Sequence, residues 1–226
     1  VVVIDNCSSD NSIEYIEKEH SDVTIIKTKM NLMFGGGYNY FFNQDTEDCF
    51  YLILNNDTIV DSKILKHFLI GANNYGLDNI YGCKIMYERN PSKIWYAGAK
   101  VNLNNGLIRH VGIRQEGIAL KDGITDYITG CCMFISSSTV RKLSGFDVRF
   151  DMYMEDVDLC LRAQKEDIYC YFLKDPFILH KVSGSSGLRF KIFKSVVSYA
   201  KLSIKHTGIL SVFNIPLFLI RRVLSI

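Results

Sequence analysis

Two acidic clusters in the sequence have the residue types that metal-assisted group transfer needs. Residues 153–162 (YMEDVDLCLR) place three carboxylates where an amphipathic helix is predicted to begin, and residues 55–58 (NNDT) follow a predicted strand. One such site can hold a divalent cation against a phosphorylated donor, because Mg²⁺ and similar hard ions take oxygen ligands and share them with substrate phosphates. The other site can accept the proton of an attacking hydroxyl.

Each of these carboxylates also has a structural interpretation. Asp57 can close an Asx turn at the end of its strand, as can Asp5 after the first strand. Glu155 and Asp156 can act only as helix caps, because the helix macrodipole favours negative charge at the N-terminus. Capping does not account for a third acid at Asp158, so we predict that the acidic helix faces a functional cleft.

The composition indicates a globular protein with a sizeable core. The chain has 226 residues, 48% of them hydrophobic, which suits one domain or one domain with an appended tail. The seven cysteines lie mostly in apolar stretches without a Cys-x-x-Cys pair, so we expect reduced core thiols in a cytosolic protein. The strand-like start VVVID lacks an initiator Met and the features of a signal peptide, so we expect a fragment whose start is missing.

The charge is distributed unevenly along the chain. No acidic residue and eight basic residues follow Asp175, so residues 176–226 carry +8, whereas the other 18 basic and 24 acidic residues give −6. A basic end rich in Ile, Leu, Phe and Val favours an anionic membrane surface over nucleic acid, and no motif of a nucleic-acid module accompanies it. We predict that residues 189–226 form a basic amphipathic helical tail, broken by Gly208 and Pro216, that docks peripherally on the cytoplasmic face of the plasma membrane. The alternative is a C-terminal helix packed on the domain.

Strand and helix patterns alternate in the first half of the chain. Strands are predicted at residues 1–4, 23–27, 49–54 and 80–86, and helices after Asn11 or Ser12, at 38–42, and after Ser62. This order implies a mainly parallel sheet covered on both faces, in which ligands bind beyond the carboxyl ends of the strands. Asp5 and Asp57 both lie at that end, so we expect them to face one pocket.

The second half changes character. Residues 95–109 are predicted to form a hairpin with an Asn-Gly turn. Strands are then expected at 126–135, 168–173 and 177–180, and helices at 138–143 and 155–164. The chain is expected to end in an amphipathic helical pattern.

Three further features have two interpretations each. The run Gly35-Gly36-Gly37 is predicted to form a tight turn that opens a helix, or a cradle of backbone N–H groups for phosphate. His180 follows an apolar strand, as a structural residue or as a metal or phosphate ligand. Trp95, the single tryptophan, packs in the core or stacks on a sugar ring.

Taken together, these segments resemble the family 2 glycosyltransferases, the nucleotide-sugar-dependent enzymes of the GT-A fold, and within them the rhamnosyltransferase-like branch that builds cell-surface polysaccharides. The resemblance runs in order from the first residue to about Gly187 and implies an α/β GT-A domain over residues 1–188, lacking its first strand, with the tail at 189–226. Its matching segments are residues 2–10 (VVIDNCSSD), 31–39 (NLMFGGGYN), 54–58 (LNNDT), 130–134 (GCCMF), 145–147 (GFD), 153–162, and His180 with Ser183 and Ser186.

The resemblance implies a role for each candidate residue. Asp57 would ligate Mg²⁺ or Mn²⁺ on the donor diphosphate, with His180 as a second metal or phosphate contact. Asp156 would be the general base, with Glu155 as its catalytic neighbour. Trp95 and Gly130 are assigned to the acceptor, and the nucleotide sugar is assigned to Asp5, Asn31, Gly36, Asn39, Asn55 and Asn56.

The expected activity is that of an inverting glycosyltransferase. It would move a hexose, with rhamnose as a candidate, from a nucleoside diphosphate sugar to a hydroxyl of a glycan or lipid-linked acceptor in cell-surface polysaccharide synthesis. Two other classes remain open on the sequence. One is a nucleotidyltransferase on a related sheet, and the other is a non-catalytic, membrane-associated sugar-binding module.

Overall fold

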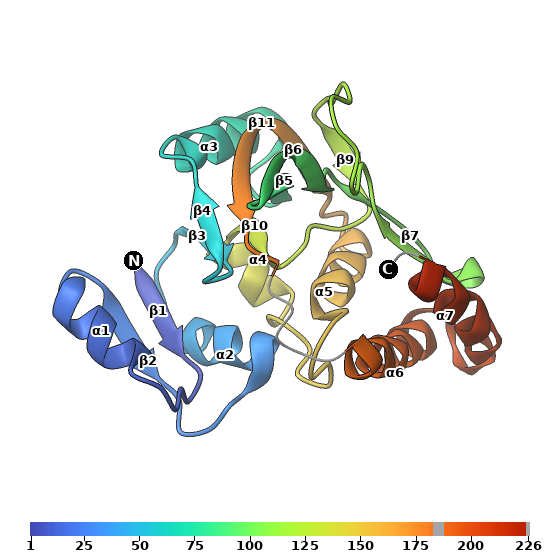
Figure 1. Cartoon of the computed structure of the whole chain (residues 1–226), viewed down its shortest axis with the longest axis horizontal. Helices are drawn as coiled ribbons and strands as arrows, with labels where there is room; N and C mark the ends of the chain where they lie inside the picture. The colour runs from blue at the N-terminus through green and yellow to red at the C-terminus, as the bar shows by residue number, and fades with distance from the viewer. Residues whose placement is uncertain (183–187, 225–226) are drawn as a thin grey trace.

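The structure is a computed structural model that describes residues 1–182 and 188–224 (Figure 1). The matched residues Ser183 and Ser186 lie outside the described residues. The chain forms an α/β fold in which helices flank a mixed sheet, as expected. One end of the molecule carries the first two strands, and the opposite end carries the C-terminal helices (Figure 1).

The N-terminal part is a parallel pair of strands with two helices. β1 (Val2–Asp5) pairs with β2 (Thr24–Lys27), with α1 (Ser12–Glu19) between them and α2 (Met33–Phe42) after them. The glycine run lies inside α2 and does not form the turn that opens it, which corrects the expected start at Tyr38. Close packing explains the first of these glycines, since a Cβ on Gly35 would lie 2.8 Å from the Phe146 Cβ, whereas a Cβ on Gly37 would make only ordinary contacts.

The main sheet has seven described strands. Its order is β3 (Phe50–Leu54), β10 (Cys132–Ser136), β5 (Ile80–Tyr87), β11 (Cys170–His180) and β4 (Thr58–Val60), with β6 (Asn90–Tyr96) on β5 and β9 (Gly123–Thr125) on β11. Only β5 and β11 pair in parallel within it. Parallel pairing therefore does not predominate among the described strands, because hairpins and loops replace many of the helical crossovers that parallel neighbours require.

Several predicted boundaries shift in the structure. The two short strands at 168–173 and 177–180 are one strand, β11, with a register shift between Leu173 and Phe177. The strand predicted from Asp126 begins only at Cys132, because residues 126–131 form a loop that passes the start of α5 (Glu155–Gln164). Two further helices in this part of the chain are α3 (Ile64–Tyr75) and α4 (Ser137–Lys142). Ser62 does not cap α3, whose N-cap is Lys63.

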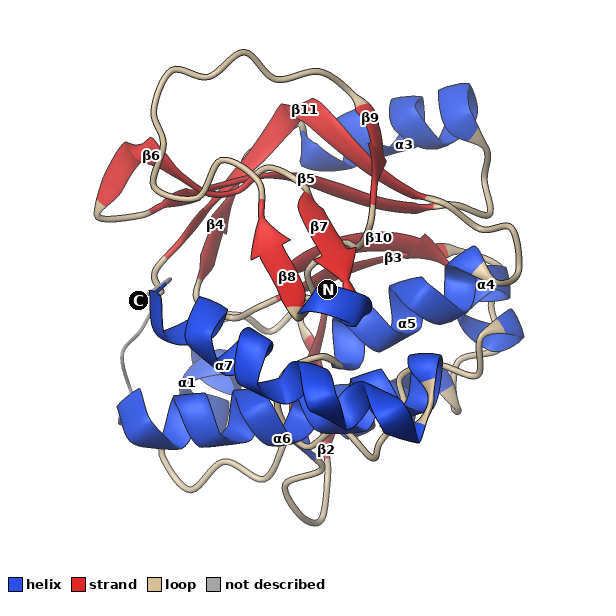
Figure 2. Ribbon diagram, turned by 90° about the vertical axis from the view of Figure 1, so that its right-hand side faces the viewer, coloured by secondary structure: helices blue, strands red, loops and turns tan. Residues whose placement is uncertain are grey.

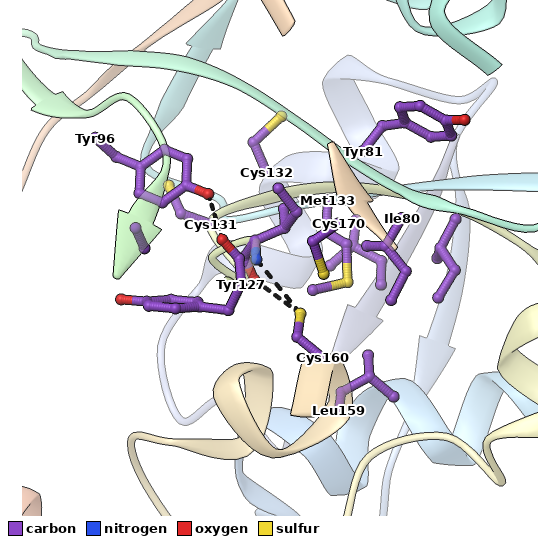
Figure 3. Packing of buried hydrophobic residues seen from close by; sticks show 14 of the residues in the cluster. Ile80, Tyr81, Tyr96, Tyr127, Cys131, Cys132, Met133, Leu159, Cys160 and Cys170 are labelled. Carbon is purple, nitrogen blue, oxygen red and sulfur yellow. Dashed lines mark hydrogen bonds between the residues drawn. The ribbon is translucent and has the colours of Figure 1, made fainter. Parts of the chain in front are cut away.

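Buried side chains between the sheet and α5 form the core, as the close view of Figure 3 shows. The Tyr96 hydroxyl donates to the carbonyl of Tyr127 over 2.7 Å, and Cys160 of α5 contacts the same loop through its sulfur (Figure 3). All seven cysteines are free and five of them are buried. Five thiols are therefore core residues as expected, whereas Cys7 is exposed and Cys49 is half-buried. The contacts of Tyr96 and Cys160 hold the 126–131 loop against α5.

A small hairpin and the C-terminal helices close the other end of the molecule (Figure 2). The hairpin consists of β7 (Ala99–Asn102), the 3₁₀ turn η1 (Leu103–Asn105) and β8 (Leu107–His110), with Gly106 in the left-handed region at φ 69°. The C-terminal elements α6 (Leu188–Thr207), η2 (Ile209–Asn214) and α7 (Ile215–Leu224) lie next to this hairpin. Gly208 separates α6 from η2, whereas Pro216 lies in the first turn of α7, where a missing N–H is tolerated. Pro216 thus begins a helix and does not interrupt one.

The C-terminal helices pack on the domain. Tyr199 of α6 is fully buried and stacks on Phe218 of α7, with ring centroids 4.1 Å apart. The Tyr199 hydroxyl donates to the carbonyl of Leu103 in the hairpin turn over 2.9 Å. A Cβ on Gly106 would lie 2.5 Å from the Phe218 backbone nitrogen, so the hairpin tip and α7 are in direct contact. No described helix is long and apolar enough to cross a membrane.

A buried ionic cluster joins α6 to the acidic helix. Asp158 of α5 is fully buried and lies 2.8 Å from Arg162 Nε, 2.6 Å from Lys205 Nζ and 2.8 Å from His206 Nε2. Burial acts to raise the pKa of Asp158, but the bonds from His206, Lys205 and Arg162 outweigh it and leave the pKa lowered. Lys205 also pairs with Asp147 at 2.7 Å. Part of the basic charge of the tail therefore neutralises acids of the domain.

We expect Asp158→Asn to lower the free energy of unfolding by about 3 kcal/mol or more, because it leaves buried cations without a counter-charge. The matched control is Asp151→Asn. Asp151 is half exposed and lies 3.5 Å from Lys194 and 3.8 Å from Lys201, so the cost there should stay below about 1 kcal/mol. Urea unfolding measures both values. Equal effects of the two substitutions would contradict a central role for Asp158.

Candidate active site

A cavity of about 880 Å³ opens where the acidic helix, the 126–131 loop, the hairpin and the C-terminal helices meet. Of the candidate residues from the sequence, those that line it are Asn55, Trp95, Gly130, Glu155, Asp156 and His180. The cavity therefore joins the proposed base, the acceptor residues and one proposed metal ligand in a single space.

The backbone before α5 is strained where it enters this cavity. Tyr153 and Met154 have φ values of 69° and 71°, so two consecutive residues with side chains adopt the left-handed region. Each such residue costs free energy and persists only where the surrounding structure fixes it. The bend directs the first turn of α5, with Glu155 and Asp156, into the cavity lining.

Two backbone N–H groups orient the carboxylate of Asp156. Gly130 donates to Oδ2 over 3.0 Å, and Val157 donates to Oδ1 over 2.8 Å. A Cβ on Gly130 would lie 2.7 Å from Cζ of Phe34, so glycine allows the loop to approach both the ring and the carboxylate. Gly130 thus lies beside the proposed base as well as in the cavity wall.

Glu155 and Asp156 form an acidic pair in which Glu155 is buried and Asp156 is half-buried. Burial, and then the charge of Asp156, raise the pKa of Glu155 to about 8. Burial also raises the pKa of Asp156, although the N–H groups of Gly130 and Val157 oppose that rise. Glu155 Oε2 is buried without a hydrogen-bond partner. At neutral pH Glu155 is therefore largely protonated. Asp156 accepts two backbone N–H groups that favour its charged form, so it is the member of the pair suited to accept a proton.

Asp57 and His180 meet at the edge of the sheet. The antiparallel pairing of β4 and β11 sets His180 opposite Thr58, so Asp57 lies beside the imidazole, with Oδ1 3.1 Å from Nε2. Asp57 Oδ1 and His180 Nδ1 are buried and make no hydrogen bond of good geometry. Burial lowers the pKa of His180, although the charge of Asp57 acts to raise it. The lowered pKa favours the neutral imidazole.

This pair fits a divalent cation that is shared with a substrate. No group of three or more His, Cys, Asp or Glu side chains suited to a metal occurs among the described residues, so a complete protein cage is not present in that part of the chain. Mg²⁺ is commonly held by one or two carboxylates together with substrate phosphates. Neutral imidazole and a carboxylate oxygen without a hydrogen bond are also suitable donors for Mn²⁺.

Trp95 stands between two imidazoles. Its ring meets those of His110 and His180 edge to face, each with centroids 4.7 Å apart. Burial lowers the pKa of His110 to about 4, and its Nδ1 lies 3.1 Å from the Trp95 carbonyl. His110 is therefore neutral, and Trp95 both lines the cavity and packs against the proposed metal ligand.

The remaining candidates for nucleotide binding lie outside the cavity lining. Asp5 ends β1 and accepts from the backbone N–H of Ser8, and Asn31 accepts from that of Met33. Asn39 is bound at both ends of its amide to the backbone of Phe146. Gly36 lies inside α2, and Asn56 is exposed in the turn before β4. Neither Asp5 nor Asp57 lines the cavity, so the expected shared pocket is not formed directly by these two carboxylates.

Several lining residues carried no signal in the sequence. His110 and Tyr127 are central to the wall, and five basic side chains surround it, namely Arg109, Arg114, Lys191, Arg221 and Arg222. They come from the hairpin, the segment after it and the C-terminal helices. The basic charge of residues 176–226 was noted in the sequence, but it was interpreted as a membrane-docking tail and gave no indication that Lys191, Arg221 and Arg222 line a cavity.

The chain belongs to glycosyl transferase family 2, whose model matches residues 1–143. It is 24% identical over 211 residues to the N-acetylglucosaminyl-diphospho-decaprenol L-rhamnosyltransferase of Mycobacterium tuberculosis, which covers 83% of this chain and 68% of that protein.

Solved structures confirm the fold. The crystal structure of GalNAc-T7 with UDP, GalNAc and Mn²⁺ matches with a TM-score of 0.65 and 12% identity, over 90% of this chain and 41% of that one. The mannosyltransferase PcManGT from Pyrobaculum calidifontis, in complex with GDP-Man and Mn²⁺, matches with a TM-score of 0.62 and 12% identity, over 96% and 63%. The chain spans less than two thirds of the length of both structures.

The acidic pair predicts a dependence of stability on pH. Because the folded pKa of Glu155 exceeds its ordinary value of 4.5, the folded state binds more protons than the unfolded state between about pH 4.5 and 8. The titration of Glu155 therefore lowers the free energy of unfolding as pH rises through that window. We expect Glu155→Gln to flatten the fall in melting temperature over this range. Parallel curves for the two proteins would contradict the assignment.

Proposed function

We propose that the protein is an inverting glycosyltransferase that transfers a hexose, with rhamnose as the first candidate, from a nucleoside diphosphate sugar to a hydroxyl of a glycan or lipid-linked acceptor. The observation that carries this proposal is the cavity itself, which is lined both by His180, the neighbour of Asp57, and by Asp156. Family membership supports transfer from an activated sugar in glycan synthesis.

Asp156 is the proposed general base. It accepts the proton of the acceptor hydroxyl while that oxygen forms a bond to the anomeric carbon and the bond from this carbon to the diphosphate breaks. Displacement from the opposite face inverts the anomeric centre. The N–H groups of Gly130 and Val157 hold both oxygens of the carboxylate in place, and the raised pKa of Asp156 brings its basicity closer to the working pH. Protonated Glu155 can donate a hydrogen bond to a substrate oxygen.

Asp57 and His180 are the proposed protein ligands of Mg²⁺ or Mn²⁺. A cation bound there supplies positive charge that stabilises the leaving diphosphate. Both solved structures hold Mn²⁺, one with UDP and the other with GDP-Man, which supports this proposal for the present chain. The nucleotide is proposed to lie along β1 and α2, near Asp5, Asn31, Gly36 and Asn39, with Asn55 and Asn56 beside the diphosphate. Trp95 and Gly130 are proposed to contact the acceptor.

A lipid-linked acceptor and a peripheral position on the inner face of the plasma membrane complete the proposal. The mycobacterial relative is named for a diphospho-decaprenol acceptor. Large apolar side chains of η2 and α7 are exposed, including Leu210 and Phe213 at 75% each. The basic residues Arg221 and Arg222 follow them in the sequence. Apolar and basic side chains in one segment suit an interfacial helix on an anionic surface.

Asp57→Asn should weaken the cation-dependent affinity for nucleoside diphosphates by about tenfold or more, since a lost ligand interaction of about 1.4 kcal/mol corresponds to that factor. Calorimetry with UDP, GDP and dTDP, each with Mn²⁺ and with EDTA, measures the change. Asp61→Asn, in the next turn, is the matched control and should leave affinity unchanged. Affinity that does not respond to EDTA in the wild-type protein would rule out the metal site.

Asp156→Asn should bind the donor normally and lower turnover by about 10² to 10⁴, the range for a positioned acid or base. The amide keeps the shape of the carboxylate but cannot accept the proton. Single-turnover kinetics with a labelled nucleotide sugar gives the rate, and NMR of the product gives the anomeric configuration. Near wild-type turnover, or retention of configuration, would exclude this mechanism.

Membrane docking is testable without removing the tail, whose helices contribute buried residues to the domain. Leu210→Ser with Phe213→Ser should reduce flotation with phosphatidylglycerol vesicles by about tenfold or more, because two large exposed apolar groups are worth several kcal/mol when buried. Leu65→Ser, an exposed leucine on α3, is the control. Wild-type protein that stays with the soluble fraction at low salt would reject docking.

A further inference from the structure

Five basic residues of the C-terminal helices fall into two sets. Lys194, Lys201 and Lys205 face the domain and pair with carboxylates of Asp147, Asp151 and Asp158. Lys191 and Arg221 line the cavity and, within the described part of the chain, have no carboxylate within 4 Å. The first set is explained by packing of the tail, whereas the second set is not.

Arg109 of the hairpin belongs with the second set. It also lines the cavity and likewise has no carboxylate within ion-pair distance among the described residues. Arg221 Nε donates to the carbonyl of Asn105 over 3.2 Å, which fixes the guanidinium at the hairpin turn. An arginine has further N–H donors in a planar fork that matches phosphate. The hairpin and the two helices therefore present three cations to one space.

The positive charge of the basic residues that line the cavity exceeds the negative charge of the acids that line it. The lining also includes Arg222, whose charge acts against the burial that raises the pKa of Tyr127 and Tyr153. The acids in the lining are Glu155 and Asp156, and Glu155 is protonated at neutral pH. The cavity thus has a positive balance that a neutral sugar acceptor does not require.

We propose that Arg109, Lys191 and Arg221 form a subsite for a phosphate or diphosphate group borne by the acceptor. This inference rests on the proposed function, in which the donor diphosphate is neutralised by the cation at Asp57 and His180. The three basic residues come from β8, α6 and α7, whereas the donor side is built from the ends of β3, β4 and β11. The exposed Leu217 and Ile220 beside Arg221 suit an apolar chain attached to that phosphate.

The test compares ligands that separate the acceptor phosphate from the donor diphosphate. Calorimetry in EDTA uses geranyl diphosphate, geraniol and inorganic pyrophosphate, and UDP, GDP and dTDP are titrated with Mn²⁺. The variant is Arg109→Gln with Lys191→Gln and Arg221→Gln, with the three single substitutions as a second set in case the triple variant is unstable. The matched control is Arg189→Gln, an exposed arginine on α6 outside the cavity lining.

We expect the wild-type protein to bind geranyl diphosphate and not geraniol. The triple variant should bind geranyl diphosphate at least about tenfold more weakly, because it removes the charge-assisted bonds to the phosphate. The control and the affinity for nucleoside diphosphates should not change. Equal losses of affinity for geranyl and nucleoside diphosphates would assign the three basic residues to the donor and overturn the proposal. Tighter binding of pyrophosphate than of geranyl diphosphate, or no effect of the triple variant, would also overturn it.

Failure of the proposed function has a different signature. A wild-type protein that binds none of the nucleoside diphosphates with Mn²⁺ overturns the donor assignment, and with it the acceptor subsite, whatever the variants show. A wild-type protein that binds them, together with variants that leave geranyl diphosphate affinity intact, overturns the subsite alone.

Discussion

The ionic contacts of Asp158 hold in place the C-terminal helices that line one side of the candidate active site. Asp158 lies in the same helix as Asp156 but is fully buried, and it holds Lys205 and His206 of α6 against α5. Once α6 is fixed, Tyr199 and Phe218 place α7 against the hairpin turn. The base, the basic residues and the hairpin then face one cavity. The cost of burying these charges is therefore balanced by contacts that organise the site.

The acidic motifs and the α/β class could be predicted from the sequence because they depend on local signals. The helix from Glu155 to Gln164 has the predicted bounds, and its three acids fall within its first turns. The meeting of Asp57 with His180 could not be derived from periodicity. It depends on β11 pairing in parallel with β5 on one side and antiparallel with β4 on the other, a choice made by tertiary packing. Only the family resemblance indicated their shared role.

For the C-terminal tail, the sequence showed the composition but not the contacts of its basic residues. Its charge asymmetry was visible in the sequence, but the pattern could not distinguish lysines that pair with the domain from basic residues that line a cavity. That division arises because the acids at positions 147, 151 and 158 lie on the face that α6 covers. The glycine run in α2 was likewise ambiguous, since at Gly35 the close approach of Phe146, more than 100 residues away, is what excludes a side chain.

The protonation of Glu155 bears on the proposed catalytic cycle. In the proposed mechanism, Asp156 enters the reaction as a carboxylate beside protonated Glu155, and burial tolerates this charge poorly. Once Asp156 has taken the acceptor proton, both carboxyl groups are neutral, and the negative charge has moved to the departing diphosphate. The pair must then lose one proton before the next acceptor can react. Sugar transfer would therefore be coupled to proton release from the same cavity.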